Sequence, residues 1–111
     1  MNWIPLRSQE ELEEIIALSN DQPQVIFKHS TRCNISSVAK SRLERASSPD
    51  NARFYYLDLL SYRPVSHSVA ERFAVEHESP QILVIKNGKC VYSESHMGID
   101  MEEIKDQLQL N

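Results

Sequence analysis

Short β-rich runs alternate with amphipathic helical patterns along almost the whole chain. The clearest helical pattern covers residues 35–46, where Ile35, Val38, Ala39 and Leu43 recur on one helix face. The β-rich runs are residues 25–27, 54–57, 81–85 and 90–92. Strands separated by helices predict a parallel sheet with right-handed crossovers, so the chain is expected to be an α/β protein.

The remaining segments complete the predicted order β-α-β-α-β-α-β-β-α. Ser8 and Glu11 form a capping box, which predicts a helix over residues 9–18. Further helices are expected from residue 62 to about 77 and after residue 100, with a short strand at residues 3–4. The pair Asn87-Gly88 between two β-rich runs is typical of a tight hairpin turn. These signals predict a mixed central sheet with an antiparallel C-terminal hairpin, flanked by helices.

Length and charge restrict the class of protein. A chain of 111 residues suits one domain over residues 1–111. The net charge of −4, with no cluster of Lys and Arg, argues against binding to nucleic acid. The longest apolar stretch, residues 82–85, is far too short to cross a membrane. The N-terminal residues lack the pattern of a secretory signal, and the chain has two cysteines, so we expect a cytoplasmic protein with reduced thiols.

Cys33 follows a polar segment between a predicted strand and the clearest predicted helix. The N-terminus of a helix favours a thiolate over a thiol, so this position suits a reactive cysteine. Arg32, Lys28 and His29 are possible sources of positive charge, although strand alternation points Lys28 and His29 to opposite faces. The alternative interpretation is a buried cysteine that acts only as a small apolar side chain.

The order of elements, with a cysteine at the second helix and Pro80 opening the fourth strand, resembles the thioredoxin fold. Cys33 and Pro80 are 47 positions apart (80 − 33). The string FKHSTRCNIS, residues 27–36, resembles the monothiol bacilliredoxins, the YtxJ-type proteins of the bacillithiol system. In that family a proline often follows the cysteine, and here the position holds Asn34.

The resemblance implies a monothiol thiol–disulfide oxidoreductase. Cys33 would remove bacillithiol from S-bacillithiolated proteins, with bacillithiol as a co-substrate and no bound cofactor. Ser36 stands where dithiol relatives have a second cysteine, and its hydroxyl would either contact the Cys33 thiolate or satisfy nearby backbone groups. Pro80 is expected to be cis, which would turn the backbone of Ser79 toward Cys33 and an extended substrate segment.

Arg32 and Asn34 complete the predicted substrate-binding set with Ser79 and Pro80. The carboxylates of bacillithiol make Arg32 or Lys28 a candidate contact for the small thiol.

Other sulfur and nitrogen ligands give weaker signals. Cys90 is expected roughly 15–20 Å from the active end, beyond the reach of a disulfide, and is interpreted as structural. The four histidines show no paired metal-ligand spacing, so no metal site is expected. His67 and His96 are weak candidates for a place near the active end.

Two other functions fit the same residues. A non-catalytic thioredoxin-fold adaptor or redox sensor would accumulate a capped Cys33 without turning over. A dimer that binds an iron–sulfur cluster is a third possibility, which the absorbance of purified protein would reveal.

Overall fold

The computed structural model describes residues 1–110, and its elements follow the predicted order. The strands are β1 (Ile4–Pro5), β2 (Gln24–His29), β3 (Arg53–Asp58), β4 (Gln81–Lys86) and β5 (Lys89–Ser95). The helices are α1 (Gln9–Leu18), α2 (Asn34–Arg45), α3 (Arg63–Phe73) and α4 (Met101–Gln109), with a short 3-10 helix η1 (His96–Gly98).

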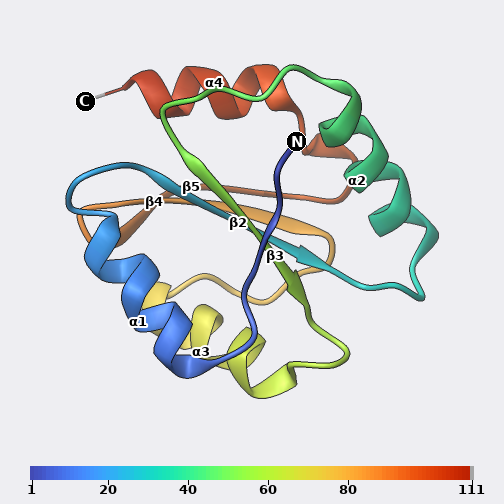
Figure 1. Cartoon of the computed structure of the whole chain (residues 1–111). Coiled ribbons are helices and arrows are strands. Elements are labelled where there is room, and N and C mark those ends of the chain that lie inside the picture. Colours follow the sequence, from blue (N-terminus) through green and yellow to red (C-terminus); the bar gives the residue numbers. More distant parts are fainter. Residues whose placement is uncertain (111) are drawn as a thin grey trace.

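The strands form one mixed sheet in the order β1-β3-β2-β4-β5 (Figure 1). β1, β3 and β2 are parallel, whereas β4 runs antiparallel to both β2 and β5. The predicted α/β architecture with an antiparallel C-terminal hairpin is therefore confirmed. Asn87 and Gly88 join the hairpin with φ angles of 51° and 75°, as a tight turn with two left-handed residues requires.

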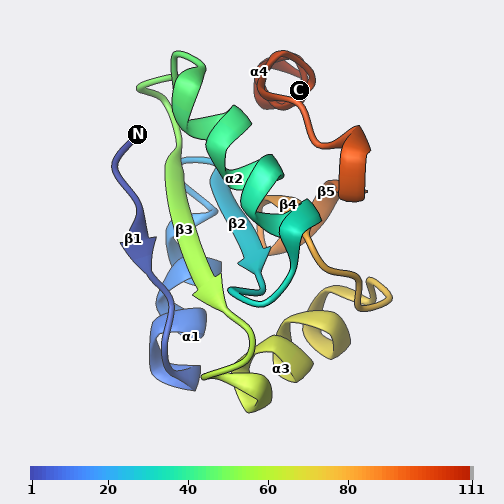
Figure 2. The ribbon, with the colours of Figure 1, turned by 90° about the vertical axis from the view of Figure 1, so that its right-hand side faces the viewer.

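Helices cover both faces of the sheet (Figures 1 and 2). Side chains of α1 and α3 pack in one apolar core, and side chains of α2 and α4 pack in the other. The central strand β2 is buried along its whole length, and its residues alternate between the cores, with Ile26 in the first and Phe27 in the second. The next two residues continue this alternation, so Lys28 and His29 face opposite layers.

α1 has the bounds that its capping box predicts, whereas α3 is shorter than the sequence pattern predicts. The backbone N–H of Glu11 donates to Ser8 Oγ at 3.1 Å, and α1 has the predicted bounds. The prediction that the third helix reaches His77 is wrong, because α3 ends at Phe73 and Ala74 adopts a left-handed φ of 54°. Residues 74–80 therefore form a loop that leads back to the sheet.

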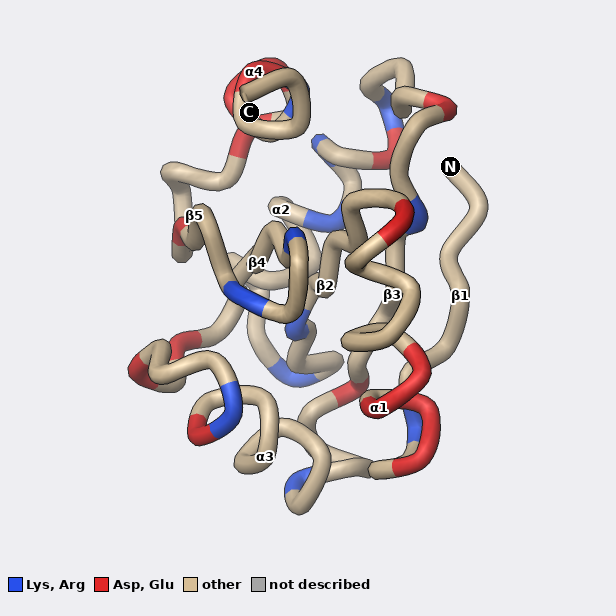
Figure 3. Tube along the Cα trace, turned by 90° about the vertical axis from the view of Figure 1, so that its left-hand side faces the viewer, with Lys and Arg blue, Asp and Glu red and all other residues tan. Residues whose placement is uncertain are grey.

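Acidic residues gather along α1 and α4 (Figure 3). Both helices have glutamates in the first turn, where negative charge complements the helix dipole. In the part of the chain that the structure describes, no helix has the length and hydropathy needed to cross a membrane.

Candidate active site

Cys33 occupies the N-cap position of α2, directly after the loop that leaves β2. Its backbone is extended, with φ −110°, its N–H donates to the Ser30 carbonyl at 3.2 Å, and its carbonyl accepts from the Ser37 N–H at 3.1 Å. The side chain is partly exposed, and among residues 1–110 it caps no backbone N–H of the helix. The sulfur therefore lies at the positive end of a helix dipole and remains accessible.

The start of β4 lies beside the C-terminal end of β2, the end that leads into Cys33. We call this end of the sheet the active edge. Lys28 pairs with Gln81 across this ladder, which places the preceding Ser79-Pro80 bond at that edge. This peptide bond is cis, as predicted. The Pro80 carbonyl accepts from the His96 N–H at 3.0 Å, so η1 is brought to the same edge.

Ser36 is completely buried beneath the loop that leads to Cys33. Its Oγ accepts from the Ser30 N–H at 3.0 Å and lies 2.8 Å from Nδ1 of His29. The Ser36 hydroxyl thus satisfies a backbone group, one of the two roles considered for it, while a contact with the Cys33 thiolate stays a prediction.

His29 is the buried end of this hydrogen-bonded group. Its ring is only 4% exposed and lies 5.8 Å from the ring of Phe27 and 5.4 Å from that of Tyr56, between centroids. Burial, and to a lesser extent the charge of Lys40, lowers the pKa of His29 below its ordinary value, so the ring is neutral at pH 7.

The basic residues near Cys33 have different environments. Arg32 and Asn34 are exposed on either side of Cys33, where a substrate can reach them. Lys28 is fully buried on the opposite face of β2, and its Nζ lies 3.2 Å from Nδ1 of His77. The two residues are 49 positions apart, so nothing local in the sequence indicates that they pair; the only signal is a lysine that follows a buried β-rich run.

Cys90 lies at the other end of the β4–β5 hairpin from Pro80. It pairs with Ile85 near the Asn87-Gly88 turn, whereas Ser95 pairs with Gln81 at the active edge. Its Sγ donates to the Tyr92 carbonyl at 3.3 Å, and burial raises the pKa of the thiol. Both cysteines are free, and their positions do not favour a disulfide between them.

The remaining histidines pair with glutamates instead of forming a cluster of ligands. Nε2 of His96 lies 3.1 Å from a carboxylate oxygen of Glu78, and His67 pairs with Glu71 one turn along α3. Across residues 1–110, no three His, Cys, Asp or Glu side chains are grouped as metal ligands would be. Of the two weak candidates, His96 lies at the active edge through Pro80, and His67 lies on the exposed side of α3.

Solved structures show the same fold. A thioredoxin-fold protein described as an oxidoreductase superposes with a TM-score of 0.78 at 29% identity, covering 93% of this chain and 90% of that one. The thioredoxin of Trypanosoma brucei brucei gives 0.76 at 15% identity, with coverage of 98% and 93%. Mitochondrial thioredoxin 3 of Saccharomyces cerevisiae gives 0.74 at 13% identity, with coverage of 96% and 93%.

The sequence itself gives a narrower assignment than the fold. The family model of the monothiol bacilliredoxin BrxC matches residues 4–104, a span that includes Cys33, Ser36 and the Ser79-Pro80 bond. A thioredoxin fold with an accessible cysteine at a helix start supports redox chemistry at that thiol. The chain therefore belongs to the monothiol bacilliredoxin family of thioredoxin-fold oxidoreductases.

Proposed function

We propose that this protein removes bacillithiol from S-bacillithiolated protein cysteines through Cys33 alone. The observation that carries the proposal is the placement of the two thiols. Cys33 is accessible at the start of α2, whereas Cys90 is partly buried at the far end of the β4–β5 hairpin. A second cysteine that could resolve a mixed disulfide within the same site is lacking among the described residues, since Ser36 takes that position.

The reaction is two successive thiol–disulfide exchanges. The Cys33 thiolate attacks the bacillithiol sulfur of the mixed disulfide, the old S–S bond breaks, and the protein cysteine leaves as a thiolate. Cys33 then holds bacillithiol as a new mixed disulfide. A second bacillithiol thiolate attacks that sulfur, releases Cys33 and forms bacillithiol disulfide, so bacillithiol is a co-substrate and no bound cofactor is required.

Exposed apolar side chains on α2 and η1 suit a protein substrate. Ile35 and Val38 on α2 are each 45% exposed, and Met97 on η1 is 58% exposed. The Arg42 guanidinium donates to the Met97 carbonyl at 3.3 Å, which holds η1 against α2. An extended substrate segment would lie against these side chains and pair with the backbone of Ser79 beside the cis bond.

The exposed polar residues beside Cys33 complete the proposed substrate site. Arg32 and Asn34 flank the cysteine and are both accessible to a mixed disulfide. Because exchange needs a reduced thiol and free bacillithiol, the proposed compartment is the cytoplasm.

The test uses the intact reduced protein with bacillithiol disulfide, followed by mass spectrometry of the whole chain. We expect one bacillithiol on wild type and on Cys90→Ser, none on Cys33→Ser, and complete removal by excess free bacillithiol. Turnover is then measured with an S-bacillithiolated protein as substrate. An adduct that forms but does not turn over would favour a redox sensor, and an adduct on Cys90 alone would contradict the proposal.

A further inference from the structure

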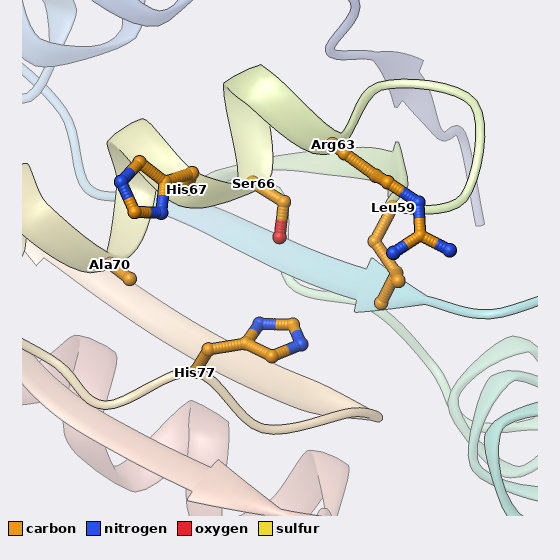
Figure 4. A pocket seen from close by; sticks show the side chains of 6 residues that line it. All are labelled: Leu59, Arg63, Ser66, His67, Ala70 and His77. Carbon is orange, nitrogen blue, oxygen red and sulfur yellow. The ribbon is translucent and has the colours of Figure 1, made fainter.

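A cavity of about 300 Å³ lies beside α3, at the active edge of the sheet but on the face opposite α2 (Figure 4). Its lining residues are Leu59, Arg63, Ser66, His67, Ala70 and His77. Arg63, Ser66 and His77 can donate hydrogen bonds into the cavity, whereas His67 already pairs with Glu71; no carboxylate is among the lining residues. A cavity of this size holds a small molecule or one end of a larger one.

The backbone connects this cavity to the segment that carries Cys33. Leu59, which lines the cavity, donates its N–H to the carbonyl of His29 at 3.1 Å. His77 lies in the loop that leads to the Ser79-Pro80 bond. Cys33 follows the same end of β2, so we expect a molecule attached to Cys33 to reach this cavity only if it is long enough to pass around the end of the sheet to the α3 side.

A buried positive charge lies behind the cavity wall. Lys28 is 0% exposed, and no ion pair in the described part of the chain includes it. Its Nζ donates to Nδ1 of His77, which is 3.2 Å away, so a neutral His77 ring carries its proton on Nε2. Burial lowers the pKa of Lys28 only to about 8, and the amine is therefore mostly charged at pH 7. A buried cation without a carboxylate partner is unfavourable, and an anion bound nearby would offset that cost.

The neighbouring strand adds a second unsatisfied group. Gln81 lies directly across the β2–β4 ladder from Lys28, on the same face of the sheet. Its Nε2 donates to the Glu76 carbonyl at 3.0 Å, while its Oε1 is buried without a hydrogen-bond partner in the described chain. Neither polar group of Gln81 is hydrogen-bonded to Lys28. Within residues 1–110, the His77 ring is therefore the side chain that is hydrogen-bonded to the Lys28 amine.

We infer that this cavity binds carboxylate groups of the small thiol that Cys33 exchanges. Arg63 at the start of α3 is exposed and offers the paired N–H groups that recognise a carboxylate, while the Ser66 hydroxyl and His77 Nε2–H donate from the wall. The identity of the thiol as bacillithiol, whose malate end carries two carboxylates, rests on the proposed function. The binding of a carboxylate in this cavity does not.

The test measures binding without any thiol chemistry. L-malate is titrated into Cys33→Ser protein at pH 7, and the ring resonances of His77 are followed by NMR. We expect saturable shifts, and about tenfold weaker binding in Arg63→Gln and in Lys28→Met. Arg45→Gln, which changes an exposed arginine at the far end of α2, serves as the matched control and should bind malate as before.

Two results would overturn the inference. One is the absence of saturable malate shifts, or their persistence at full affinity in both Arg63→Gln and Lys28→Met. The other is equal affinity for inorganic phosphate, which would make the cavity a general anion site. Exchange by wild type with bacillithiol disulfide is measured separately. Malate binding without exchange would refute only the proposed function. Exchange with an unchanged KM in Arg63→Gln would refute the link between this cavity and the exchanged thiol and would leave the proposed function intact.

Discussion

The hydroxyl of Ser36 lies 2.8 Å from Nδ1 of His29, so the third residue of α2 is fixed to the last residue of β2. Both side chains are buried, and the Ser30 N–H is the third member of the group. This hydrogen-bonded group joins the two ends of the loop that carries Cys33. Mutations of this group should therefore change the stability of the loop as well as the reactivity of the thiol.

Substituting Ser36→Ala removes the partner of two buried groups, the Ser30 N–H and the His29 ring. We expect the free energy of unfolding to fall by about 1–3 kcal/mol, measured by urea denaturation. Ser37→Ala, at an exposed neighbouring position, is the control and should lose less than about 0.5 kcal/mol. Equal losses in the two variants would contradict the role of the buried hydroxyl.

Cys90 should react with iodoacetamide much more slowly than Cys33 at pH 7. Burial raises the pKa of Cys90 and shields its sulfur, whereas Cys33 is accessible at a helix start. We expect at least about a tenfold difference in rate, read by mass spectrometry of the two single-cysteine variants. Comparable rates would show that the hairpin opens readily around Cys90. The variant Cys90→Ala should also retain full turnover of an S-bacillithiolated substrate.

Lys28→Met should stabilise the protein at neutral pH and lose part of that advantage as the pH rises. The pKa of Lys28 falls from 10.5 to about 8 on folding, so between these values the unfolded chain binds the additional proton. The stability contributed by this site therefore increases with pH across that window in wild type, and the variant lacks the increase. From pH 7 to pH 9.5 the advantage of the variant over wild type should shrink by about 2 kcal/mol, measured by urea denaturation at each pH. A constant difference would show that Lys28 is not desolvated in the folded protein.

Asn34→Pro tests the residue at which this chain differs from the pattern of its family. Asn34 is the first residue of α2, where a missing N–H costs no helical hydrogen bond, and the extended backbone of Cys33 suits a residue before proline. We expect a gain of roughly 0.4–1 kcal/mol in the free energy of unfolding, measured by urea denaturation, because the unfolded chain loses conformational freedom. A loss of stability would show that the Asn34 side chain makes a needed contact in the active loop. The adjacent exposed variant Ile35→Ala provides a control for changes to the same turn.

Local signals allowed most of the fold to be predicted. The capping box at Ser8 and Glu11 and the turn at Asn87-Gly88 act within a few residues, so the sequence pattern alone located both. The end of α3 was misplaced because Ala74 adopts a left-handed conformation that usually favours glycine, and nothing in its sequence neighbourhood indicates this.

The features of the site that could not be predicted from the sequence are contacts between residues that are far apart along the chain. The sequence pattern located Cys33 at the start of the clearest helix, whereas the cis bond at Pro80 was predicted only from the family resemblance. The partner of Lys28 lies in the loop that precedes β4, so it is found only once β4 is known to be the neighbour of β2. A buried lysine in a strand indicates that a partner must exist, but it does not indicate that the partner is His77.

The sheet order also has a consequence for the newly made chain on the ribosome. Cys33 and the strand before it are synthesised early, but the site is completed by β4, which pairs with β2 from more than forty positions later in the sequence. A nascent chain that has emerged only as far as α3 presents its cysteine beside an unpaired strand edge, without the Ser79-Pro80 segment that would position a substrate. Selective exchange should therefore begin only once the β4–β5 hairpin has left the exit tunnel, well after Cys33 itself has emerged.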